Sequence, residues 1–143
     1  MAAVRVHRLA ALIAALAISF ALAAPVALAS LVLPPSQAGV AVYDLAGIWD
    51  AATESTAQGI ADTIRARTQA QLAIVSYPSD DCDVSTETAG ADALLIMNTW
   101  GVGRAGVNDG LVVLFDMNCG SVAHGQIYLY AGSGFVDQYL NPD

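Results

Sequence analysis

The fold of this chain is decided by the stretch Leu111-Val112-Val113-Leu114-Phe115, its most apolar strand candidate. A short apolar run of this kind, placed directly after turn-forming residues, is typical of a strand that is covered on both faces. Residues 72–77 form a second such run, which ends at Pro78. Because strands covered on both faces occur mainly in parallel sheets flanked by helices, the sequence predicts an α/β fold.

Shorter elements complete a predicted order of strand, helix, strand, helix, strand, strand. A brief β-type run covers residues 40–43, and residues 126–130 alternate aliphatic and tyrosine side chains. Apolar residues at helical spacing predict one helix from Asp44, its expected N-cap, to about Arg67. The same spacing over residues 93–100 predicts a second helix, with Ser85 or Thr86 as its possible cap and Gly101 as its stop. This order predicts a small α/β sandwich with a mostly parallel sheet and one antiparallel strand.

The N-terminal segment has the outline of a signal peptide. Two arginines give it a positive start, and an uncharged apolar run follows over residues 9–22. Small residues around Ala29 match the pattern that signal peptidases cleave, which predicts a signal peptide over residues 1–29. An uncleaved membrane anchor stays open as an alternative, because residues 9–33 carry no charge and about 20 such residues cross a bilayer.

Residues 30–39 connect this segment to the rest of the chain. They contain Pro34-Pro35, which favours extended backbone and predicts a short linker. The domain then spans residues 40–143. A total length of 143 residues suits one domain of this kind and is short for two.

The charge balance excludes nucleic acid as a partner. The chain has no lysine, and its five arginines face 13 acidic residues, which gives a formal net charge of −8. Cleavage of the signal peptide would remove two arginines and leave three against the same 13 acids, a formal charge of −10. Such a surface repels a phosphate backbone.

The two cysteines follow the two central strands. In an exported chain, one pair of cysteines without a C-x-x-C motif indicates a disulfide. Cys82 and Cys119 each lie just past the end of a predicted parallel strand, so their loops share one edge of the sheet. The α-carbons of a disulfide lie within about 7 Å, which adjacent loops can satisfy. The sequence leaves open both a disulfide and two thiols that never meet.

Three short motifs occur in a characteristic order. They are Val42-Tyr43-Asp44-Leu45-Ala46 at the first strand, Asn108-Asp109-Gly110 before the apolar strand, and Gly132-Ser133-Gly134 after the last strand. Their order and spacing resemble the TPM domain family over residues 40–143. The resemblance implies a three-layer α/β/α sandwich in an exported or membrane-attached protein. Members usually continue into further helices, so it also implies a domain that is incomplete at its C-terminus.

Five aspartates are the candidate metal ligands, namely Asp44, Asp80, Asp81, Asp83 and Asp109. Three of them crowd into the loop after residues 72–77, where a hard cation such as calcium would relieve the repulsion between the carboxylates. Asp44 follows a strand at the same edge, where open α/β sheets bind ligands. The structural alternatives are a solvated acidic loop and a helix cap at Asp44.

Asp109 is included because the resemblance places a polar group near the proposed site at this position. Its alternative role is a tight turn that leads into the strand. Asp109 precedes its strand, so a parallel layout places it at the opposite edge from Asp44. Either the glycine-rich loop 101–106 folds across the sheet, or the two groups of aspartates serve different purposes.

Two functions from different classes remain. The favoured one is an extracytoplasmic module that binds calcium or another divalent metal and acts as an accessory or interaction module of a membrane protein complex. The alternative, implied by the resemblance, is a metal-assisted acid phosphatase that hydrolyses phosphomonoesters, with Asp44, Asp81 and Asp83 as metal ligands. The sequence has no G-x-S-x-G motif, and His124 falls in a predicted loop, so no nucleophile is identified.

Overall fold

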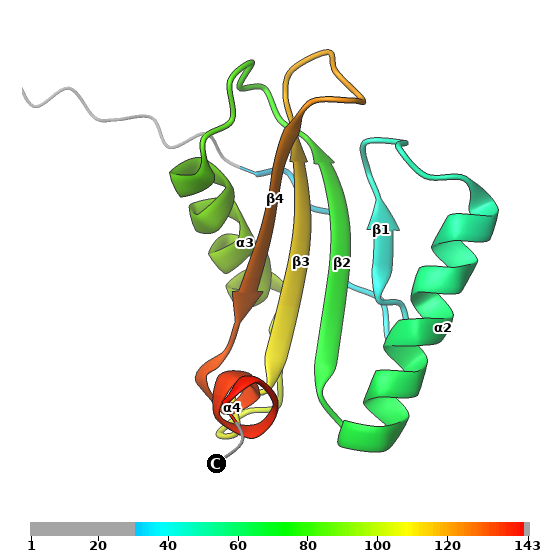
Figure 1. Ribbon diagram of the computed structural model, residues 1–143, viewed down its shortest axis with the longest axis vertical. Coiled ribbons are helices and arrows are strands. Elements are labelled where there is room, and N and C mark those ends of the chain that lie inside the picture. Colours follow the sequence, from blue (N-terminus) through cyan, green and yellow to red (C-terminus); the bar gives the residue numbers. More distant parts are fainter. Residues whose placement is uncertain (1–30, 142–143) are drawn as a thin grey trace, which may run out of the picture. The chain divides into compact units, whose positions relative to one another are not determined.

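The computed structural model describes residues 31–141. In chain order its elements are β1 (Val42–Asp44), α2 (Ala51–Thr68), β2 (Gln71–Pro78), α3 (Thr86–Trp100), β3 (Gly110–Met117), β4 (Gly125–Ala131), α4 (Ser133–Phe135) and the short π-helix η1 (Val136–Leu140) (Figure 1). The predicted order through β4 is confirmed. The predicted signal peptide over residues 1–29 lies outside the described residues.

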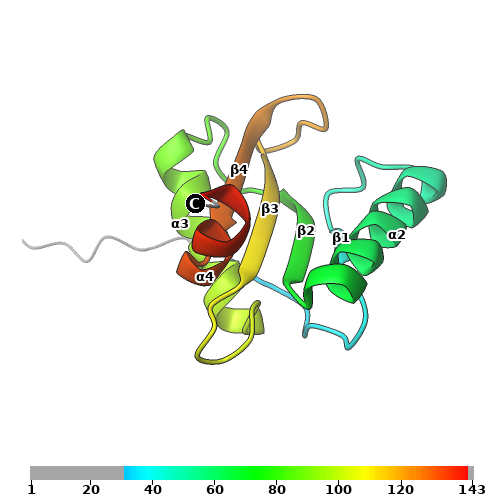
Figure 2. The same cartoon turned by 60° about the horizontal axis from the view of Figure 1, so that its bottom comes forward.

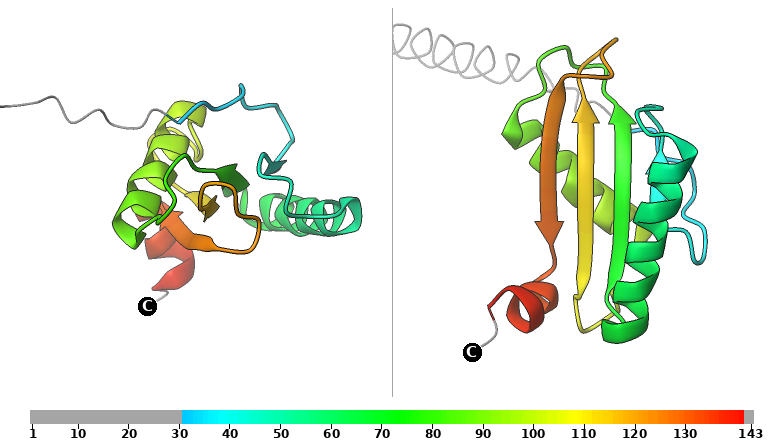
Figure 3. Two further views of the ribbon diagram at one scale, coloured as in Figure 1. Left: turned by 90° about the horizontal axis from the view of Figure 1, so that it is seen from above. Right: turned by 45° about the vertical axis from the view of Figure 1, so that its right-hand side comes forward.

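The strands form one mixed sheet in the order β1-β2-β3-β4. β1, β2 and β3 are parallel neighbours, and β4 returns antiparallel to β3. α3 covers one face of the sheet behind β3 and β4, whereas α2 lies on the other face beside β1 and β2 (Figure 1, Figure 3). The α/β fold with helices on both sides of a mostly parallel sheet is therefore confirmed.

The hydrophobic core lies between the sheet and α3. Alternate positions of the strands point to this face, and the buried members of the core are Tyr43, Ala73, Val75, Val112 and Leu114 from the sheet with Ala93, Ile96 and Met97 from α3. The opposite face is covered less completely, because α2 reaches only β1 and β2. On that face Ile127 and Leu129 of β4 are 62% and 61% exposed.

The start of α2 differs from the sequence prediction. Asp50, and not Asp44, is the N-cap, and its carboxylate accepts a hydrogen bond from Thr53 N at 2.7 Å. Gly47 adopts a φ of +66°, which a helix does not allow, so the apolar residues after Asp44 form a loop. Within that loop Trp49 packs edge-on against Phe115 at a ring distance of 5.1 Å. The loop's helix-like spacing thus reflects packing on the sheet.

The residues before β1 lie against the domain. Leu31 and Leu33 pack on the core, and the indole of Trp100 donates to the carbonyl of Pro34 at 2.9 Å. The free edge of β1 is closed by Gln58 of α2, whose side-chain oxygen accepts from two backbone amides there. Among residues 31–141, no helix has the length and hydropathy of a membrane span.

The two ends of the parallel strands carry different structures. α4 and η1 follow β4 at the edge where β2 and β3 begin (Figure 2). Gly132 anchors this turn, because its N–H donates to the carbonyl of Gly110 at 2.9 Å. The opposite, carboxyl edge of the parallel strands carries the loops that contain both cysteines.

Candidate functional site

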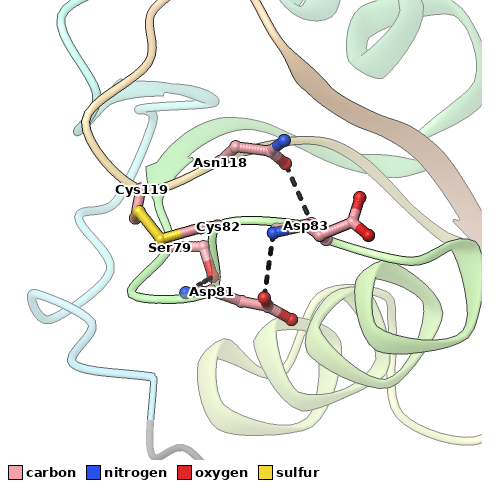
Figure 4. The surroundings of a disulfide bond; sticks show 7 residues. Ser79, Asp81, Cys82, Asp83, Asn118 and Cys119 are labelled. Carbon is pink, nitrogen blue, oxygen red and sulfur yellow. Dashed lines mark hydrogen bonds between the residues drawn. A yellow bond between two sulfur atoms is a disulfide. The ribbon is translucent and has the colours of Figure 1, made fainter.

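The loops that follow β2 and β3 are joined covalently at the carboxyl edge of the sheet. A disulfide links Cys82 to Cys119, whose α-carbons lie 4.4 Å apart (Figure 4). The backbone N–H of Cys119 also donates to the carbonyl of Asp81 at 2.8 Å. Of the two alternatives left by the sequence, the structure therefore has the disulfide.

The acidic loop after β2 is ordered by hydrogen bonds of its own. Asp81 N donates to Ser79 Oγ at 3.1 Å, and Asp83 N donates to Asp81 Oδ1 at 3.0 Å (Figure 4). Asn118, from the loop after β3, accepts from the backbone at residue 84 at 3.1 Å. The side chains of Asp80, Asp81 and Asp83 are exposed. The loop therefore presents three carboxylates to solvent from a backbone that is held on both sides.

Asp44 lies at the same edge, at the end of β1, but its carboxylate already accepts hydrogen bonds from within the domain. Its two oxygens accept from Ile48 N at 3.0 Å and from Trp49 N at 2.9 Å, and the hydroxyl of Ser76 donates to it as well. Burial of the Asp44 carboxyl works against ionisation, but the hydrogen bonds from Ser76 and the backbone amides outweigh it and lower the pKa. Asp44 therefore closes the loop that precedes α2.

Asp109 lies at the opposite edge of the sheet and is neutralised by an arginine. Its carboxylate accepts from Arg104 N at 2.8 Å and from Arg104 Nε at 2.7 Å, and the Nη2 atom of Arg104 lies 2.6 Å away. Although burial of Asp109 opposes ionisation, this guanidinium and its hydrogen bonds lower the pKa of the carboxyl. The glycine-rich loop 101–106 thus turns back onto Asp109. Asp109 stays at the edge where β3 begins, opposite the edge that carries Asp81.

A further acidic pair lies beneath the acidic loop. Asp116 near the end of β3 has no exposed surface, and neither of its carboxylate oxygens has a hydrogen-bond partner among the described residues. Burial is the main cause that raises the pKa of Asp116 to about 7, followed by the charge of Asp92 on α3, a hydrogen bond between the two carboxyl groups when one of them is protonated, and the charge of Asp81. Burial also raises the pKa of Asp92. Two ionised carboxylates cannot donate to each other, so this pair needs a bound proton or a cation.

The structure brings together only part of the predicted metal set. Asp80, Asp81 and Asp83 share the carboxyl edge with Asp44, whereas Asp109 lies at the other edge. In the described part of the chain, no three His, Cys, Asp or Glu side chains are grouped closely enough to hold a metal ion as they stand. The assignment of the five aspartates as metal ligands therefore stays a prediction.

Asp92 and Asp116 are acidic residues that the sequence analysis did not include in the site. A signal for Asp116 was present, because it continues the alternation of Val112 and Leu114 on the buried face of the strand. Asp92 similarly lies one helical turn before the buried Ile96. Charged residues at core-facing positions are rare unless they are paired, so both positions were informative.

Comparison with known proteins supports the same fold. The family model described as the TPM domain matches residues 42–139. Among solved structures, the solution NMR structure of the N-terminal domain of a protein from P. gingivalis is similar, with 22% sequence identity and a TM-score of 0.54. The match covers 68% of this chain and 57% of that one, so this chain spans little more than half the length of that domain. No curated protein matches significantly.

Proposed function

This chain belongs to the TPM domain family, and we propose that it is an extracytoplasmic module that binds a divalent metal ion. Calcium is the expected ion. The bound form would act as an accessory or interaction module of a membrane-associated complex.

The observation that carries this proposal is the acidic loop held at the carboxyl edge of the sheet. Asp80, Asp81 and Asp83 place three carboxylates on a backbone tied down by the disulfide and by Asn118. Calcium prefers carboxylate and carbonyl oxygens in loops, and it would cancel the repulsion between these side chains.

The other two predicted ligands fit a metal less well. The carboxylate of Asp109 is paired with Arg104, and that of Asp44 accepts hydrogen bonds from Ser76 and from the loop backbone. A cation at either position would have to displace groups that already satisfy the carboxylate. The acidic loop therefore fits a cation better than either of these two residues.

The compartment follows from the disulfide and from the predicted signal peptide. Disulfides persist in oxidising environments outside the cytoplasm, and the N-terminal segment has the pattern of an export signal. Both features support an extracytoplasmic location. N-terminal sequencing of the protein recovered from the cell envelope or medium tests this, and a chain that starts at Ser30 is the expected result.

The charge distribution favours a binding module over a phosphatase. A phosphomonoester dianion needs cationic groups. Of the three arginines within residues 31–141, Arg65 and Arg104 are engaged by Asp62 and Asp109, and the third, Arg67, lies in the last turn of α2. A bound metal would have to reverse the sign of a strongly acidic surface before a phosphate could approach it.

Calcium titration of the full chain tests the proposal and separates it from the alternative. Uptake seen by calorimetry, together with a higher melting temperature in calcium than in EDTA, is expected. Hydrolysis of an aryl phosphate that EDTA abolishes, and that is lost in Asp81→Ala, would support the phosphatase instead. The proposal fails if neither calcium nor magnesium binds at millimolar concentration.

A further inference from the structure

The outer edge of β4 has no neighbouring strand in the described part of the chain. The sheet order places β1 at one edge and β4 at the other (Figure 1). An edge strand of this kind presents backbone N–H and C=O groups that its own sheet does not satisfy. β4 is therefore a surface on which another strand can pair.

The backbone groups of the odd-numbered residues of β4 point to this open edge. Gly132 N donates to the carbonyl of Gly110 on β3, so the even-numbered residues face β3. Because the direction of hydrogen bonding alternates along an antiparallel strand, Ile127 and Leu129 direct their N–H and C=O groups away from β3. The side chains of these two residues are also exposed, on the face of the sheet opposite α3.

β4 carries none of the features that usually keep an edge strand from pairing. Its sequence, Gly-Gln-Ile-Tyr-Leu-Tyr-Ala, has no charged residue and no proline. It pairs with β3 residue by residue over its whole length, so it has no bulge. The chain as a whole has a formal net charge of −8, which makes an uncharged strand the place where a second copy meets the least repulsion.

We propose that β4 pairs antiparallel with β4 of a second copy of this chain, about a two-fold axis at Tyr128, the middle residue of the strand. Ile127 then lies opposite Leu129 of the second copy, and Leu129 lies opposite Ile127. Both residues face outward, so each such pair exchanges two backbone hydrogen bonds, and their apolar side chains form one row across the junction. The inference goes beyond the proposed function and needs no bound cation.

α3 adds apolar surface to the other side of the same edge. The helix lies close above β4, because a Cβ on Gly90 would lie 3.0 Å from the ring of Tyr128. Leu94, one turn further along α3, is 38% exposed and lines one surface hollow with Tyr130. The two-fold axis would bring α3 of the second copy beside this stripe, so the interface extends beyond the two strands.

The closed edge at β1 limits the assembly to two copies. Once both β4 strands are paired, the outer strands are the two β1 strands. There the side-chain oxygen of Gln58 already accepts from Ala41 N at 2.8 Å and from Val42 N at 3.3 Å. The pair is therefore a closed dimer and not the start of a fibre. One strand and its flanking side chains make a small interface, so we expect a dissociation constant of about micromolar order.

Sedimentation velocity tests the association, with the full chain in EDTA and a mild detergent that shields its apolar N-terminal segment. At about 100 μM the wild type is expected to sediment mainly as a dimer. Ile127→Glu would place two carboxylates about 7–8 Å apart across the junction, and we expect at least about a tenfold rise in the dissociation constant. Ile60→Glu makes the same change on α2 at a side chain that is 55% exposed, and this matched control should dimerise normally.

Disulfide crosslinking tests the register. In the proposed pair the two residues at position 128 lie directly opposite each other with α-carbons about 4.5 Å apart, which suits a disulfide. Copper-catalysed air oxidation of Tyr128→Cys should therefore give a dimer on a non-reducing gel. Tyr130→Cys is the control, because the two copies of position 130 would be more than about 13 Å apart. We expect at least about tenfold less crosslinked dimer from this control.

Three results would overturn the inference. They are a monomeric wild type at about 100 μM, an Ile127→Glu variant that dimerises as tightly as the wild type, and equal crosslinking of Tyr128→Cys and Tyr130→Cys. A monomeric wild type would leave the edge to a strand of a different protein. Thermal unfolding shows whether each variant folds, and if Tyr128→Cys does not, Ile127→Glu carries the test because its side chain is exposed. Calcium binding, which tests the proposed function, does not enter any of these outcomes.

Discussion

Loss of the disulfide should remove a large part of the stability of this domain. The double substitution Cys82→Ser with Cys119→Ser opens a loop whose ends are 37 residues apart in the sequence. For a loop of that size, the chain-entropy relation predicts that the crosslink lowers the entropy of the unfolded chain enough to contribute about 4 kcal/mol at 25 °C. Cys82 is exposed and Cys119 is half-buried, so serine adds little desolvation of its own. We therefore expect the free energy of unfolding to fall by about 4 kcal/mol.

Urea unfolding of the full chain, followed by tryptophan fluorescence, measures this difference. Trp49 packs on Phe115 and Trp100 packs on Tyr43, so both tryptophans report on the sheet and its coverings. The dependence on urea should become steeper in the variant, because an unfolded chain without the crosslink exposes more surface. Reductant should lower the wild type to the level of the variant and leave the variant unchanged.

A small effect would refute the reasoning. If the double variant loses less than about 1 kcal/mol, the crosslink does not limit the unfolded chain as the entropy relation requires. The two loops would then be joined mainly by two hydrogen bonds, one from Cys119 N to the carbonyl of Asp81 and one from Val84 N to the side-chain oxygen of Asn118.

Four further predictions concern buried charges and glycines. Asp109→Asn should lower the free energy of unfolding by about 2 kcal/mol in urea experiments at neutral pH, because it breaks the ion pair with Arg104. The loss is limited to this size because Arg104 is partly exposed, so water replaces some of the lost pairing. Since the pKa of Asp109 is lowered, this advantage should be lost as pH falls below the ordinary value of 3.8, and a difference that persists in acid would contradict the ion pair. Gly59→Ala, in the exposed middle of α2, should raise the free energy of unfolding by about 1 kcal/mol. Gly110→Ala should lower it by about 3 kcal/mol, because the new Cβ would lie 2.2 Å from a backbone oxygen, and equal melting temperatures would exclude this contact. In EDTA, the raised pKa of Asp116 should make the wild type less stable as pH rises from about 4 to about 7, because the folded state keeps a proton that the unfolded state has released. Asp116→Asn should lose that slope in thermal unfolding measured across the same pH range.

Local sequence patterns predicted most of the fold. The runs over residues 72–77 and 111–115 became β2 and β3, each slightly longer than predicted. The helix after Asp44 was placed too early, because spacing alone cannot distinguish a helical stripe from a loop whose apolar side chains also face the sheet. The positive φ of Gly47 is the local feature that separates these two cases, and glycine in a sequence does not reveal its φ.

The candidate site was predicted less completely. The sequence placed Asp81 and Asp83 at the carboxyl edge, because loops that follow parallel strands share that edge. It did not find the pairing of Asp92 with Asp116, which lie far apart in the chain. It also did not reveal that Arg104 neutralises Asp109, because the fold of a glycine-rich loop depends on the contacts it finds.

The amino-acid sequence by itself determined the order of the elements, the mostly parallel sheet and the acidic character of one edge. These properties follow from hydrophobic periodicity, turn residues and charge, which act over short stretches of chain. Only the tertiary structure decided which carboxylates are satisfied and which are not. Asp44 and Asp109 find donors, whereas Asp116 finds another carboxylate, because the ionisation of a buried group depends on its burial and on the groups that distant segments bring to it.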